Sequence, residues 1–130
     1  MARIKHIAIR TPDVEKTSAF YKELFGLEQV GAGRNGVYLS DGHINLAILR
    51  PRDQGGEGAG RIGIDHVGFQ VEDVDATLAK LKQLGGRLLT ERVDMTPTDP
   101  SHPQSYFEIK CLGPDDQEFD ISHAGWVGTE

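Results

Sequence analysis

The chain has 130 residues, of which 38% are hydrophobic and 26% charged, and this composition predicts one globular domain with a buried core. Its formal net charge of -6 argues against a nucleic-acid partner, which normally needs a basic face. The sequence has neither a run of about 18 apolar residues nor the layout of a signal peptide. We therefore expect a cytoplasmic protein without a membrane partner. Cys111 is the single cysteine, so no intrachain disulfide is predicted.

The first predicted element is a strand near residues 5–10, in which apolar and other residues alternate. Ile7 and Ile9 fall on one face of this strand, whereas His6 falls on the other face. A helix is predicted next, with Asp13 in its N-cap region and Gly26 as its C-terminal stop. The histidine therefore points away from the main apolar face of the strand.

Three shorter strands should complete the first half of the chain. They are predicted near residues 27–31, 36–40 and 43–50, with short turns between them. The segment at about residues 52–63 is rich in glycine, which indicates a linker. The first half is thus a βαβββ unit at about residues 1–51.

The second half repeats the first at an offset of 60 positions, and nine residues coincide over the opening strand and helix. Among them are His6 with His66 and Asp13 with Asp73. Further strands are predicted near residues 87–93, 105–112 and 117–122. The sequence thus predicts a single α+β domain over residues 1–130 with two βαβββ repeats, the second at about residues 64–123.

The two repeats differ in length before their final strands. The segments NLAI and EFDI correspond at an offset of 73 rather than 60, so the second repeat has about 13 additional residues. The excess fits residues 93–105, which contain three prolines and show no periodicity. A substrate-contacting lid and a solvent-exposed crossover are both open interpretations of this loop.

The duplicated unit resembles the vicinal oxygen chelate superfamily, which includes glyoxalase I, methylmalonyl-CoA epimerase, extradiol dioxygenase, fosfomycin-resistance and bleomycin-resistance proteins. The resemblance is carried by KHIAIRTPDVEKTSAFYKELFGLE, IDHVGFQVEDVDATLAKLKQLGG and YFEIKCLGPDDQEFDIS, which together cover most of the chain. It implies that the two repeats curl into a half-open β-barrel around one divalent metal ion. A histidine on each opening strand is what this family pattern requires.

The resemblance also implies a set of metal ligands. His6 and His66 occupy the first-strand positions, and Asp120 occupies the acidic position of the last strand, with Glu118 as the alternative on the same strand face. The fourth position falls near Ala47, which cannot bind a metal. Two imidazoles and one carboxylate suit Fe²⁺, Mn²⁺, Zn²⁺ or Ni²⁺, and the sequence does not choose among them.

The implied function is metal-dependent chemistry on a small substrate that chelates the metal through oxygens, either a glyoxalase-family lyase or isomerase or an extradiol-type dioxygenase. Glu118, His43 and Tyr106 are the candidate catalytic groups. The alanine at the fourth position counts against a standard glyoxalase I or epimerase site. The alternative is a metal-free small-molecule binding protein of the bleomycin-resistance type. In either case we expect a homodimer.

Overall fold

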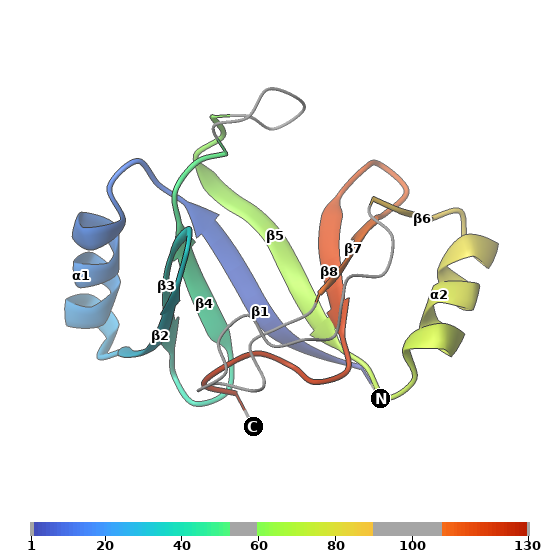
Figure 1. Cartoon of the computed structure of the whole chain (residues 1–130), viewed down its shortest axis with the longest axis horizontal. Helices are drawn as coiled ribbons and strands as arrows, with labels where there is room; N and C mark the ends of the chain where they lie inside the picture. Colours follow the sequence, from blue (N-terminus) through green and yellow to red (C-terminus); the bar gives the residue numbers. More distant parts are fainter. Residues whose placement is uncertain (1, 53–59, 90–107, 130) are drawn as a thin grey trace. The chain divides into compact units, whose positions relative to one another are not determined.

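The computed structural model of the chain describes residues 2–52, 60–89 and 108–129. These residues form two compact units. The N-terminal unit contains His6–Asp65 and Val127–Glu130, and the C-terminal unit contains His66–Trp126 and Met1–Lys5. Figure 1 labels the elements of both.

The first repeat runs β1 (Arg3–Arg10), α1 (Val14–Phe25), β2 (Glu28–Gly33), β3 (Gly36–Ser40) and β4 (Asn45–Leu49). Its strand order is β2-β3-β4-β1, with β1 parallel to β4 and the other pairs antiparallel. The parallel pair follows from the connectivity, because the helix carries the chain back before the two hairpins begin. β1 and β4 therefore run side by side, although they lie far apart in sequence.

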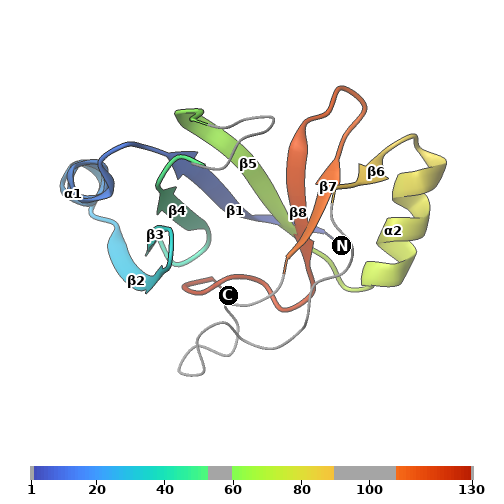
Figure 2. The ribbon, with the colours of Figure 1, turned by 45° about the horizontal axis from the view of Figure 1, so that its top comes forward.

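The second repeat runs β5 (Gly63–Gln70), α2 (Val74–Gln83), β6 (Arg87–Leu88), β7 (Ile109–Leu112) and β8 (Glu118–Ser122). Its strand order is β5-β8-β7-β6, again with one parallel pair, β5 and β8. Figure 2 shows α2 beside β6 in this unit. The predicted α+β class with two βαβββ repeats is confirmed.

The two helices begin in the same way, as the coincidence of their aspartates predicts. The Asp13 carboxylate accepts a hydrogen bond from the backbone N–H of Lys16 at 3.0 Å, and Asp73 accepts one from Ala76 at 3.0 Å. Gly26 ends α1 with a φ of 70°, in the left-handed region that glycine enters without strain. The local signals that repeat in sequence therefore form the same local structure.

The helices differ in what they bury. Leu78 and Leu81 of α2 pack against a core that is built around Ile109, Cys111 and Ile121. On α1 the apolar stripe is not covered, since Phe20, Leu24 and Phe25 are 57%, 58% and 64% exposed. The stripe thus forms an apolar surface of the N-terminal unit.

Among the described residues, no helix has the length and apolar character that a membrane crossing requires. The cytoplasmic location stays a prediction, as do the single-domain organisation and its boundaries. The predicted loop at residues 93–105 lies outside the described residues.

Candidate metal centre

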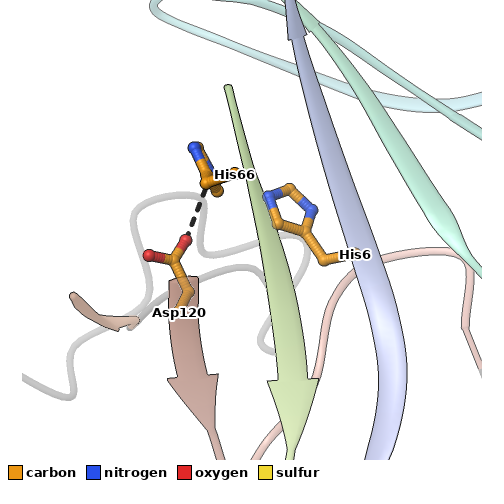
Figure 3. A group of neighbouring side chains, drawn as sticks. All are labelled: His6, His66 and Asp120. Atoms are coloured by element: carbon orange, nitrogen blue, oxygen red, sulfur yellow. Dashed lines mark ion pairs between the residues drawn. The ribbon is translucent and has the colours of Figure 1, made fainter. Parts of the chain in front are cut away.

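The core of the candidate site is the parallel pair β5 and β8. Gly68 faces Asp120 in the register of these strands, and His66 and Glu118 stand two residues earlier on each strand. The Nε2 atom of His66 lies 3.2 Å from Oδ2 of Asp120, and its Nδ1 atom lies 3.4 Å from Oε2 of Glu118. His66 and Asp120 are 4% and 0% exposed. One buried imidazole thus lies between two carboxylates. Figure 3 shows His66 with its ion-pair partner Asp120.

The first repeat builds the same arrangement on β1 and β4. His6 faces Asn45 in register, and the Nδ1 atom of His6 lies 2.8 Å from Oδ1 of Asn45. The amide of Asn45 also donates to the backbone carbonyl of Val127 at 2.9 Å, which fixes its orientation. His6 and Asn45 are 3% and 1% exposed. A histidine of the opening strand is therefore held from Nδ1 by the final strand in each repeat.

The register identifies the equivalent positions of the two final strands. Ala8 faces Ala47 as Gly68 faces Asp120, so Ala47 is the counterpart of Asp120. Ala47 is fully buried and has no donor atom. The fourth ligand position that the sequence predicted near Ala47 is therefore a buried alanine. Asn45, two residues earlier on β4, is the counterpart of Glu118.

Lys110 of β7 also contacts Asp120. Lys110 faces Asp120 in register, and its Nζ atom lies 3.2 Å from Oδ1 and 3.4 Å from Oδ2. The same ammonium lies 3.7 Å from Oε2 of Glu108. The indole N–H of Trp126 donates to Oε1 of Glu108 at 2.6 Å. Asp120 and Glu108 therefore share one neighbouring cation.

These contacts raise the pKa of both Glu108 and Lys110, for different reasons. Burial and the neighbouring Asp120 carboxylate raise the pKa of Glu108. Burial alone lowers the pKa of Lys110, but the Asp120 and Glu108 carboxylates more than offset it, and the net shift of this pKa is upward. Lys110 thus stays an ammonium ion beside the buried Asp120.

The predicted catalytic groups have different positions. Glu118 lies at the site, against His66. His43 has an exposed side chain in the turn before β4, where its backbone N–H donates to Oδ1 of Asp41 at 2.9 Å. Two backbone N–H groups on this oxygen, from Ile44 and His43, lower the pKa of Asp41. Tyr106 lies outside the described residues.

Glu108 and Lys110 are residues of the site that the sequence analysis did not find. Their signal is the alternation of EIKC, in which Ile109 and Cys111 are fully buried while Glu108 and Lys110 lie on the other strand face. That face is the one that carries Asp120 on β8. The sequence shows that Glu108 and Lys110 share a polar strand face. It does not show the register that puts this face beside Asp120.

Two βαβββ repeats with a buried histidine on each opening strand define the vicinal oxygen chelate class of protein. The Glyoxalase/Bleomycin resistance protein/Dioxygenase superfamily pattern matches residues 3–104. The chain belongs to this superfamily, so the predicted relationship is confirmed.

Two curated relatives of the chain are named as epimerases of CoA thioesters. The chain is 30% identical over 105 residues to the mitochondrial methylmalonyl-CoA epimerase of Homo sapiens, which covers 72% of this chain and 60% of the human protein. It is 31% identical over 102 residues to the ethylmalonyl-CoA/methylmalonyl-CoA epimerase of Cereibacter sphaeroides, covering 68% of this chain and 75% of that protein. The chain thus spans less than two thirds of the human relative's length.

A solved structure with the same fold is the Mn(II)-bound glyoxalase of Novosphingobium aromaticivorans. The similarity has a TM-score of 0.72 at 20% identity and covers 100% of this chain and 42% of that chain. It confirms the predicted fold class. The choice between glyoxalase and dioxygenase chemistry is not confirmed, since the curated relatives are named as epimerases.

The chemistry of the donor set fits a divalent metal ion. His66 and Asp120 are buried and carry an imidazole and a carboxylate, and His6 repeats the imidazole on β1. Nitrogen and carboxylate donors of this kind suit Mn²⁺, Fe²⁺, Zn²⁺ and Ni²⁺. The donor set and the membership of the superfamily support a divalent metal as the cofactor.

Proposed function

We propose that this chain is a metal-dependent isomerase that moves a proton at the carbon next to the carbonyl group of a small acyl-CoA thioester. The observation that carries the proposal is the buried pair of His66 Nε2 and Asp120 Oδ2, 3.2 Å apart. The repetition of the histidine at His6 supports a metal rather than a structural ion pair. The names of the relatives, epimerases of CoA thioesters, support the substrate class.

His6, His66 and Asp120 are the side chains that we assign to the metal. When bound, a divalent ion supplies a Lewis acid for a carbonyl oxygen of the substrate and stabilises negative charge that develops on it. Asn45 and Glu118 contact the two imidazole rings at Nδ1, so Nε2 is the atom of each ring that we assign to the metal. Glu118 is therefore a positioning residue in this proposal, although the sequence suggested it as a catalytic group.

Glu108 is the group that we assign to proton transfer. It is the carboxyl group that shares Lys110 with Asp120, and the Trp126 indole fixes one of its oxygens at 2.6 Å. A general base must be held in a fixed geometry close to the proton that it removes. The contacts with Trp126 and Lys110 fix Glu108 near Asp120, which supports this assignment. Ala47 supplies no carboxylate, so the base must come from another strand.

The test is deuterium incorporation from D₂O into methylmalonyl-CoA, measured by mass spectrometry on protein loaded with Mn²⁺. We expect exchange with the wild type, and at least a hundredfold slower exchange with Asp120→Asn and with Glu108→Gln. Asp116→Asn is the matched control, because it makes the same change of residue type at an exposed position. Asp116 lies in the connection between β7 and β8, and its side chain is 54% exposed. Exchange by Asp120→Asn at the wild-type rate would contradict the proposal.

The same preparations separate the alternative functions. Consumption of O₂ with a catechol, only in the presence of iron, would favour the dioxygenase. Ligand binding that is unchanged after chelation of the metal would favour the sequestering protein of the bleomycin-resistance type. An isomerase should work without O₂ and should lose activity on chelation.

We also propose that the chain forms a homodimer through α1. Phe20, Leu24 and Phe25 make a contiguous apolar stripe, each more than half exposed, and such surfaces commonly mark protein contacts. Sedimentation equilibrium should give twice the mass of the chain, and Phe20→Glu with Phe25→Glu should give the monomer. A wild-type monomer, or a dimer that survives both substitutions, would contradict this interface.

A further inference from the structure

Five arginines gather at one end of the N-terminal unit, in a chain whose net charge is -6. They stand at the end of β1, in the β2–β3 turn, after β4 and before β5, and they are Arg10, Arg34, Arg50, Arg52 and Arg61. Together they are five of the 14 lysines and arginines of the chain. This arginine cluster is a strong local concentration of positive charge in an acidic protein.

Asp65 is the carboxylate at the centre of the cluster. Its Oδ2 atom lies 3.4 Å from Nε of Arg10 and 2.9 Å from Nη2 of Arg52. The side chain of Arg10 is 10% exposed and that of Arg52 is 30% exposed. One negative charge thus meets two guanidinium groups, and this part of the cluster keeps a net positive charge.

Backbone contacts join the other arginines to this pair. Arg10 donates from Nη1 to the carbonyl of Arg50 at 3.0 Å, and the guanidinium of Arg50 donates to the carbonyl of Arg34. Gly60 donates its N–H to the carbonyl of Arg52 at 2.9 Å, which places Arg61 next to the same segment. Neutral carbonyls hold the guanidinium groups of Arg10 and Arg50 without cancelling their charge. The backbone segments that carry the five arginines are therefore connected to one another.

Arg10, the first residue of the cluster, lies on the face of β1 that carries His6. Arg10 is four residues after His6, so both side chains point to the same side of the strand. At about 3.3 Å per residue, their Cα atoms are about 13 Å apart. The cluster therefore begins at the end of β1, about 13 Å along the strand from His6.

We propose that the arginine cluster binds the phosphate groups of a coenzyme A thioester, with Arg34, Arg50, Arg52 and Arg61 as the contacting residues and the Arg10–Asp65 pair as their buried anchor. Guanidinium groups bind phosphate oxygens through paired, charge-assisted hydrogen bonds. A small local cluster suits a small polyanion, whereas the net charge of the chain disfavours a nucleic acid. The identity of the ligand rests on the proposed function.

The experiment is titration calorimetry of the metal-free protein with coenzyme A, and with pantetheine, which lacks the nucleotide phosphates. The variant is Arg34→Gln with Arg61→Gln, because both side chains are exposed and the Arg10–Asp65–Arg52 contacts are kept. Arg3→Gln with Arg87→Gln is the matched control, which removes the same charge from exposed positions of the C-terminal unit.

We expect Arg34→Gln with Arg61→Gln to bind coenzyme A at least tenfold more weakly, with wild-type affinity in the control and no change for pantetheine. The affinity of the wild type should fall with added salt, as ion-pair contacts require. Equal loss in both double variants would show a nonspecific charge effect and overturn the proposal. So would wild-type binding by the cluster variant, or no binding of coenzyme A by the wild type.

Failure of this site and failure of the proposed function are distinguishable. A pantetheine thioester lacks the phosphates but carries the reacting group, so its deuterium exchange should be the same in the wild type and the cluster variant. Exchange without coenzyme A binding would overturn only the phosphate site. Coenzyme A binding without exchange on either thioester would support the site and overturn the isomerase.

Discussion

Lys110 and Asp120 face each other in register on β7 and β8, and the ammonium nitrogen lies within 3.4 Å of both carboxylate oxygens. Asp120 is fully buried, whereas the side chain of Lys110 is 31% exposed. A buried carboxylate with a single fixed geometry is what a metal ligand requires, and the ammonium supplies that fixation. The same charge also reduces the negative potential that attracts a divalent ion.

Lys110→Met should weaken Mn²⁺ binding by roughly tenfold to a hundredfold, the usual effect of losing a group that orients a metal ligand. Lys110→Arg keeps the charge and the donor, and it should restore most of the affinity. Titration calorimetry with Mn²⁺ measures both. Tighter binding by Lys110→Met would mean that the lysine competes with the metal instead of orienting its ligand.

Asp120→Asn should abolish the thermal stabilisation that Mn²⁺ gives to the wild type. A ligand that binds only the folded state at about 100 times its Kd stabilises by about 2.7 kcal/mol. Differential scanning calorimetry with and without Mn²⁺ should show this gain in the wild type and in Asp116→Asn. A gain of equal size in Asp120→Asn would remove Asp120 from the ligand set.

The equivalent residues of the two repeats could be predicted from the sequence. They depend on the alternation of residues along a strand and on the offset between the repeats, and the sequence shows both directly. Strand alternation put His6 and His66 on the non-apolar face, and the offset of 73 matched Ala47 with Asp120 before the register was known. The observed pairs Ala8–Ala47 and Gly68–Asp120 confirm that match. These positions could be matched by comparing the two repeats, without knowledge of tertiary contacts.

Glu108 and Lys110 could not be placed beside Asp120 in this way. Their position depends on the register of β7 against β8, which is set by the connection after Leu112. In that connection Asp116 takes a φ of 61°, a conformation that the sequence does not specify for an aspartate. A shift of one residue would have turned Lys110 to the other face of the sheet.

Asn45 faces His6 in the register of β4 and β1, and its Oδ1 atom lies 2.8 Å from Nδ1 of His6. Asn45→Ala would leave a buried imidazole nitrogen and the Val127 carbonyl without this amide, at a cost of about 1–3 kcal/mol. We expect chemical denaturation to show that loss, and Mn²⁺ affinity to fall as well. Unchanged metal affinity at reduced stability would assign Asn45 a structural role alone.

Cys111 gives a prediction in the buried core of the C-terminal unit. The side chain is fully buried, and burial together with the Asp120 charge raises the pKa of its thiol from 9.0 to about 11. The thiolate is the reactive form, so at pH 8 this shift lowers its population roughly a hundredfold relative to the unfolded chain. Iodoacetamide should therefore alkylate the native protein at least a hundredfold more slowly than the denatured protein. Alkylation at similar rates would show that β7 opens readily.

The same shift makes the stability of the protein depend on pH in the alkaline range. Between pH 9 and about 11 the unfolded chain loses the Cys111 proton while the folded chain keeps it. The folded state then binds more protons, so the free energy of unfolding falls as pH rises, by at most about 1.4 kcal/mol per pH unit. Cys111→Ser removes this group from the titration and should flatten that part of the curve. Urea denaturation at pH 8, 9 and 10 measures the slope, and identical slopes for both proteins would contradict the assignment.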